Sequence, residues 1–171
     1  MSINMRTISK TLLLILVASI SPTTLAKSER GIFPNDIVYC TQDNLQDRSI
    51  SIKEIKQILE KESPSYVRPN GAYLKYLGRI KNRHAAFNIV GSAFFHGTAQ
   101  DESKRIFVFS SNWHYLGEYG DVADFPVSFC RNELLFPYNA SYGYAMVFSN
   151  SRPPDQVQLN GVAYNFDDTK E

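Results

Sequence analysis

A series of β-strands is predicted by the hydrophobic pattern of residues 72–119, which read AYLKYLGRIKNRHAAFNIVGSAFFHGTAQDESKRIFVFSSNWHYLGEY. Residues 72–80 place apolar side chains on one face and basic side chains on the other, as a half-buried strand does. Residues 87–96 form a nearly continuous apolar run, which is typical of a central strand, and Gly91 within it indicates a bulge or a bend. This part of the chain therefore favours a sheet.

Two hairpins are predicted from short turns between apolar runs. Residues 105–110 and 114–119 flank a turn that contains Trp113. Further along the chain, Asn160 and Gly161 separate two segments of alternating polarity. An Asn-Gly pair in this position favours a type I′ turn, because both turn residues need a positive φ angle.

One amphipathic helix is predicted before the strands. Ser51 and Glu54 have the spacing of a capping box, in which each residue satisfies a backbone N–H group at the start of the helix. An apolar stripe of helical period follows, and Pro64 ends it. The stripe consists of Ile52, Ile55, Ile58 and Leu59.

Together, these elements predict an α+β fold with a mainly antiparallel, meandering sheet of seven to nine short strands and one helix packed on it. A β-sandwich or barrel with an attached helix is the alternative architecture. The remaining strands are expected at residues 36–40, 126–131 and 142–148. No repeat or long linker divides the chain, so residues 27–171 are expected to form a single domain with a polar C-terminal tail.

Residues 1–26 have the features of a secretory signal peptide. Arg6 and Lys10 precede an apolar run at residues 12–20, and small residues lead to a cleavage site after Ala26. Nine apolar residues are too few to span a bilayer, which needs about 20. We therefore expect a secreted or periplasmic protein with no transmembrane anchor after cleavage.

The cysteine content fits the same expectation. Cys40 and Cys130 are the two cysteines of the chain, and an even pair in a small exported domain predicts a disulfide. The alternative, a reactive thiol nucleophile, conflicts with this pairing, since the bridge would consume both thiols.

Charge is distributed unevenly along the chain, although the net charge is only +1. Residues 63–100 contain five basic residues and no acidic residue, whereas residues 118–171 contain eight acidic and three basic residues. In one interpretation the two segments are neighbouring strands joined by salt bridges. In the other, a basic face flanked by Tyr66, Tyr73 and Tyr76 binds an anionic partner.

The second interpretation predicts a binding surface. Four of the basic residues alternate with other residues along one extended segment, so their side chains are expected on the same side of the strand. These four are Lys75, Arg79, Lys81 and Arg83. Trp113 is expected at an exposed hairpin tip, where it could insert into a cleft of the partner. The predicted binding residues are Tyr73, Lys75, Arg79, Lys81, Arg83 and Trp113.

Catalytic motifs give little support for an enzyme. The chain lacks a Gly-x-Ser-x-Gly elbow, a Ser-x-x-Lys motif and a His-Glu-x-x-His motif. The spacing of His84, His96 and His114 is not that of a metal site, so no metal or cofactor is predicted. Acid–base pairs assembled from distant residues remain an alternative.

Two such alternatives are defined by their residues. A nuclease could use His96 and His114, with Arg79 or Arg83 holding phosphate; a glycosidase could use Glu102 and Glu118. The small-hydrolase alternative is thus assigned to His96, His114 and a carboxylate such as Glu118.

The preferred interpretation is an exported, non-catalytic binding protein of the cell envelope, similar in role to an inhibitor or an immunity protein. Its expected partner is a protein, and nucleic acid is not the default partner. An envelope structural or adhesion module is a third possibility.

Overall fold

The computed structural model describes residues 32–44, 50–63, 66, 72–96, 101–137 and 144–168. The predicted signal peptide lies outside these residues, as does the end of the polar tail. The elements follow in the order β1 (Val38–Tyr39), η2 (Gln42–Asn44, a 3₁₀ helix), α1 (Ile52–Glu62), β2 (Tyr73–Lys81), β3 (Ala86–His96), β4 (Asp101–Ser110), β5 (Tyr115–Tyr119), β6 (Ser128–Cys130), β7 (Glu133–Leu135), β8 (Ala145–Val147), β9 (Gln156–Leu159) and β10 (Val162–Asp167).

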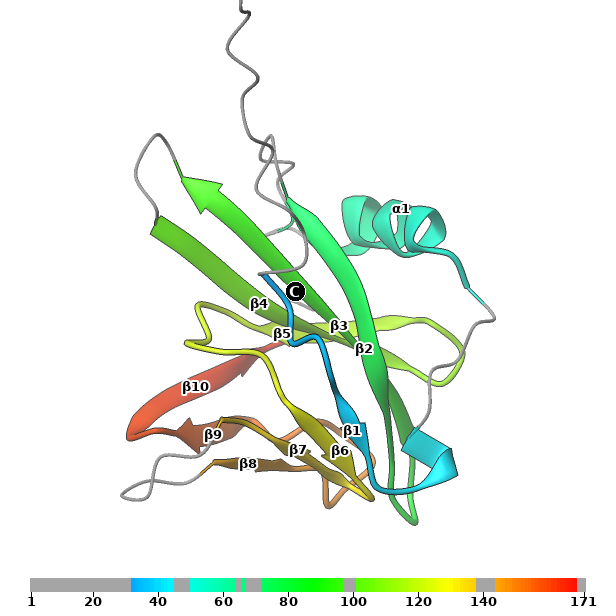
Figure 1. The fold of residues 1–171 in the computed structure, drawn as a ribbon. Helices are drawn as coiled ribbons and strands as arrows, with labels where there is room; N and C mark the ends of the chain where they lie inside the picture. The colour runs from blue at the N-terminus through cyan, green and yellow to red at the C-terminus, as the bar shows by residue number, and fades with distance from the viewer. Residues whose placement is uncertain are drawn as a thin grey trace, which may run out of the picture.

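The strands form two sheets (Figure 1). The larger sheet has the order β2-β3-β4-β5-β10-β9, and the smaller sheet has the order β1-β6-β7-β8. The chain builds β2 to β5 as a meander, leaves to form β6 to β8, and returns to place β10 beside β5. All strand pairs are antiparallel except β1 with β6, which are parallel.

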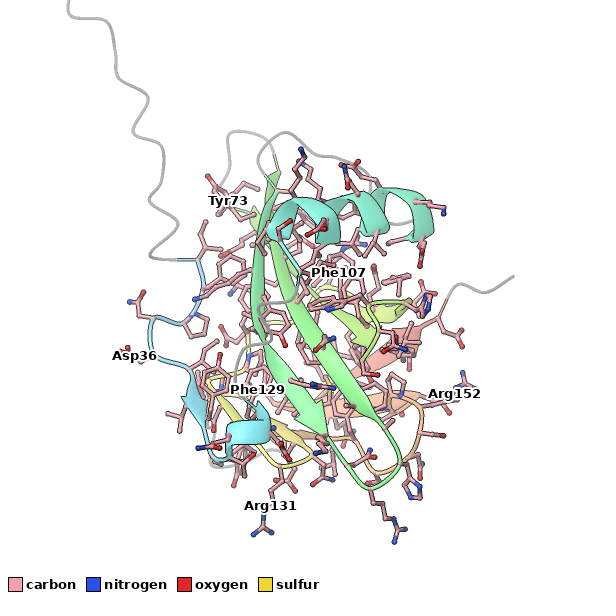
Figure 2. All side chains as sticks on the ribbon, turned by 90° about the vertical axis from the view of Figure 1, so that its right-hand side faces the viewer. Asp36, Tyr73, Phe107, Phe129, Arg131 and Arg152 are labelled. Carbon is pink, nitrogen blue, oxygen red and sulfur yellow. A yellow bond between two sulfur atoms is a disulfide. The ribbon has the colours of Figure 1, made fainter. Side chains whose placement is uncertain are left out.

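Each face of the larger sheet buries a different set of side chains. One face shares a core with the smaller sheet, for example through Ile89 and Val108 of the larger sheet and Phe129 of the smaller. The other face is covered by α1, whose Ile55 and Leu59 pack with residues such as Phe107 (Figure 2). The predicted α+β class is confirmed, and the two sheets with a shared core place the architecture nearer to the sandwich alternative than to a single meandering sheet.

Local sequence signals set several of these elements. The Ser51 hydroxyl accepts a hydrogen bond from the Glu54 N–H, and the Glu54 carboxylate accepts one from the Ser51 N–H, so the predicted capping box is confirmed. Asn160 and Gly161 have φ angles of 51° and 80°, as a type I′ turn between β9 and β10 requires.

Gly91 does not form a bulge. It lies in regular register, opposite Lys75 on one side and Ile106 on the other. A Cβ atom at Gly91 would approach Phe125 to 2.9 Å and both Leu77 and Phe33 to 3.0 Å. The glycine is required by this close approach of core side chains, and the register shift occurs instead in β2, between Tyr76 and Gly78.

The predicted disulfide between Cys40 and Cys130 is confirmed. Cys40 directly follows β1 and Cys130 ends β6, and these two strands pair in parallel. The bridge therefore joins the first strand of the described chain to a strand 90 residues later. Within the described ranges, neither helix has the length and apolar character needed to cross a bilayer.

Candidate functional site

The predicted basic face is divided between the two sides of the larger sheet. Lys75 lies opposite Gly91, on the side of the shared core, whereas Arg79 lies opposite Asn88, on the side of α1. The expectation that these cations share one side was wrong. The reason is the bulge between Tyr76 and Gly78, because one extra residue reverses the alternation of all side chains that follow.

The acidic C-terminal strands do not cover the basic residues. Strands β9 and β10 lie toward the opposite edge of the larger sheet from β2. Lys81 instead forms an ion pair of 3.0 Å with Asp43 of η2, and both side chains are more than half exposed. Arg83 lies exposed in the turn between β2 and β3, where its Nε donates a hydrogen bond to Nε2 of His84.

A further cation near Lys81 was missed by the sequence analysis. The Lys81 N–H donates to the carbonyl of Arg131, whose side chain projects into solvent from the turn between β6 and β7 (Figure 2). Arg131 is 50 positions from Lys81 in the sequence and belongs to the acidic half of the chain, so no local pattern connects the two.

Trp113 does not lie at an exposed tip. It is half-buried, and its ring packs against Tyr76 and Phe109 at centroid distances of 5.4 and 5.7 Å. Its positive φ of 63° turns the side chain back over the sheet, beside the core layer under α1. Tyr66 and Tyr76 are also buried in this layer and therefore do not serve as exposed aromatic anchors.

The candidate binding site is a cleft of about 440 Å³ beside β2. In Figure 1, β2 stands at the front edge of the larger sheet, with the segment leading to β1 on one side and α1 on the other. The cleft is lined by residues of all three: Asn35, Asp36, Ile37, Tyr39, Ile52, Leu74, Lys75 and Tyr76. Of these, only Lys75 belongs to the binding residues predicted from the sequence.

The two sides of the cleft differ chemically. Leu74 and Tyr76 of β2 face α1, on the same side as Ile52, an apolar residue that is 43% exposed. Lys75 points the other way, where its ammonium donates to the carbonyl of Pro34 at 3.1 Å and lies over the Phe33 ring. The cleft thus has an apolar wall at α1 and a polar wall at residues 35–36.

Tyr73 lies next to this cleft. Its ring is half-buried against Phe95 at a centroid distance of 6.1 Å, and it precedes the lining residue Leu74. The sequence-predicted pair Tyr73 and Lys75 is therefore brought to one place, and Arg79, Lys81, Arg83 and Trp113 are placed elsewhere.

The N-terminus of α1 is not an open anion site. The Glu54 carboxylate accepts hydrogen bonds from both the backbone N–H and the hydroxyl of Ser51. These bonds hold the pKa of the Glu54 carboxyl below its usual value. The positive end of the helix is therefore already matched by a carboxylate of its own first turn.

The residues of the hydrolase alternative are not brought together. His96 ends β3 opposite Asp101, at the start of β4, whereas the His114 carbonyl accepts a hydrogen bond from the N–H of Ser110, at the end of β4. The two histidines are therefore at opposite ends of β4, about 30 Å apart. Glu102 and Glu118 belong to opposite faces of the sheet. Glu102 is on the same face as Ile106, which belongs to the core shared with the smaller sheet, whereas Glu118 lies opposite Phe107, on the face covered by α1. Among the described residues, no group of three potential metal ligands occurs.

Glu118 instead belongs to a buried polar network under the end of α1. It is only 4% exposed, and its carboxylate accepts hydrogen bonds from Arg105 Nη1 at 2.6 Å, from the Tyr115 hydroxyl at 3.1 Å and from the Ser63 hydroxyl at 3.4 Å. The network joins α1 to β4 and β5.

Buried tyrosines should make the fold sensitive to alkaline pH. Burial raises the pKa of the Tyr39, Tyr115 and Tyr119 hydroxyls above the ordinary value of about 10. The folded state therefore keeps protons that the unfolded state loses, so the stability supplied by these groups is complete below pH 10 and is lost as the pH rises above it.

We expect the melting temperature to fall steeply above pH 10, with tyrosinate absorbance at 295 nm rising together with unfolding. The Tyr115→Phe variant should show a shallower fall, because one of the three groups is removed. A melting temperature that stays constant from pH 9 to pH 12 would contradict this assignment.

A second cavity, of about 400 Å³, lies beside β5 and β10. Its lining includes the apolar residues Leu116 and Phe166 and an exposed ion pair between Arg152 and Asp168. None of the sequence-predicted site residues lines it.

No family model, curated protein or solved structure matches this chain, so no relative supplies a function for either cavity.

Proposed function

We propose that this chain is an exported, non-catalytic binding protein of the cell envelope that recognises a protein partner, in the manner of an inhibitor or an immunity protein. The observation that carries the proposal is the cleft beside β2, where an exposed isoleucine, Ile52, and the cation of Lys75 form opposite sides of one concave surface. Pockets with an apolar wall and a few placed polar groups are typical of binding sites.

Two further features support the proposal. The signal-like pattern of residues 1–26 and the disulfide between Cys40 and Cys130 are both compatible with an oxidising compartment outside the cytoplasm. The separation of His96 from His114 removes the specific arrangement on which the hydrolase alternative depended. No observation favours that alternative over a binding role.

Site-specific photo-crosslinking in the host cell tests the proposal. A benzoylphenylalanine at position 52 should give a discrete adduct with an envelope protein, which mass spectrometry identifies. Position 162 is the matched control, because Val162 is also an exposed apolar residue, at 51%, and lies outside the cleft. N-terminal sequencing of the same material should begin at Lys27. Identical adducts from both positions, or a chain that retains residues 1–26 in the cytoplasm, would contradict the proposal.

A further inference from the structure

We infer that the cleft beside β2 accepts an extended segment of the partner, which adds to the larger sheet as an extra strand next to β2. This inference rests on the proposed function and names the form of the ligand. An edge strand offers a row of backbone donors and acceptors, and strand addition to such an edge is a common mode of peptide recognition. Strand β2 is an edge of the larger sheet.

The second half of this edge is covered by hydrogen bonds with other parts of the chain. In the second half, the Tyr39 hydroxyl donates to the Leu77 carbonyl, the Asn44 amide donates to the Arg79 carbonyl, and the Lys81 N–H donates to Arg131. The bulge between Tyr76 and Gly78 also lies there. Covering groups and bulges are the devices with which proteins protect an edge from pairing.

The first half of β2 lines the cleft through Leu74, Lys75 and Tyr76, and Tyr73 lies beside it. The hydrogen bonds from Tyr39 and Asn44 and to Arg131 cover the edge at residues 77–81. The Lys75 side chain, which could have shielded the edge, is turned onto Pro34 and Phe33. The protected half ends where the cleft begins, so a pairing strand would meet the edge at residues 73–75.

The side chains of β2 predict the pattern of the incoming segment. A paired strand presents its side chains alternately to the two faces of a sheet, as β2 does. Alternate residues of the partner would therefore contact the apolar wall at Leu74 and Ile52, and the residues between them would lie beside Lys75. Asp36 and Lys75 are the charged residues among those that line the cleft. An acidic side chain of the segment beside the Lys75 ammonium would match its charge, so the segment is expected to alternate apolar and acidic residues.

A phage-displayed library of random linear decapeptides, selected on the immobilised mature protein, supplies the probe. Selected peptides should alternate apolar and acidic residues. Their affinity should fall about tenfold or more on Ile52→Glu and remain within about twofold of wild type on the matched control Val162→Glu. Lys75→Glu should weaken binding and flatten its salt dependence. Peptide binding should also slow amide hydrogen exchange at residues 73–75.

Backbone N-methylation separates strand addition from other modes of binding in the cleft. If the peptide pairs with β2, methylation at alternate positions should lower affinity about tenfold or more, and methylation at the positions between them should have little effect. Binding that tolerates methylation at every position, or a selection whose peptides ignore Ile52→Glu, would overturn strand addition. A phage-display selection that yields no binding peptide would overturn it too. In each of these cases a specific crosslink from position 52 would leave the proposed function standing.

Discussion

Removal of the disulfide is expected to lower the free energy of unfolding by roughly 4–5 kcal/mol, according to the chain-entropy account of a cross-link. The Cys40–Cys130 bridge closes a loop with a sequence separation of 90 residues, so it strongly restricts the unfolded chain. The Cys40→Ser/Cys130→Ser double variant removes this restriction. Because the unfolded ensemble then exposes more surface, the denaturant m-value should rise together with the loss of stability.

Urea unfolding of the double variant and of the reduced wild-type protein measures this effect. The two should agree, because both lack the same cross-link. Circular dichroism at zero denaturant should keep its β-sheet character, since the shared core of the two sheets does not depend on the bridge. A loss smaller than about 1 kcal/mol with an unchanged m-value would show that the unfolded chain is not restricted in the way the entropic account assumes.

The elements predicted correctly from the sequence are those whose causes are local. The capping box of α1 needs two side chains three residues apart, and the β9–β10 turn needs two neighbouring residues that accept a positive φ. Each signal is complete within a few residues. The disulfide was predictable because two cysteines allow only one intramolecular pairing.

The side on which the cations of β2 lie depends on a single extra residue. Leu77 interrupts the alternation of apolar and basic residues, and Gly78 beside it is a residue type that often marks a bulge, but the sequence analysis expected the bulge at Gly91. The bulge places Leu77 and Gly78 on the same core side, where Phe129 and Tyr39 pack closely against Gly78. These rings arrive from segments far away in the sequence, so the reversal that separates Lys75 from Arg79 follows from tertiary packing.

The candidate site was predictable only in part for the same reason. Tyr73 and Lys75 were recognised because they lie within the basic segment, but Ile52 was assigned to the buried stripe of the helix. The stripe is wider than the surface it covers, and Ile52, at its first turn, reaches beyond the sheet and lines the cleft. Helical periodicity indicates which residues share a face and does not indicate where the neighbouring sheet ends.

The buried ion pair between Arg105 and Glu118 should give the other large effect on stability. Its N–O distance is 2.6 Å, and the two side chains are 22% and 5% exposed. In the Arg105→Met variant, the Glu118 carboxylate stays buried but no longer has a cation beside it. Removal of one partner from a buried pair costs about 3–5 kcal/mol. Trp113 is the only tryptophan and packs beside the layer under α1, so its fluorescence reports on unfolding of this region.

A second substitution determines whether the uncompensated charge causes the loss. Arg105→Met/Glu118→Gln removes both charges, and the glutamine carbonyl can still accept the hydrogen bond from the Tyr115 hydroxyl. Buried pairs replaced by neutral groups are often no less stable, so the double variant should recover most of the stability lost in Arg105→Met. The exposed pair of Lys81 and Asp43 provides the control: Lys81→Met should cost less than about 1 kcal/mol, since solvent screens that interaction. If the double variant is no more stable than Arg105→Met, the loss arises from packing of the Arg105 side chain over the Phe94 ring and not from the charge left on Glu118.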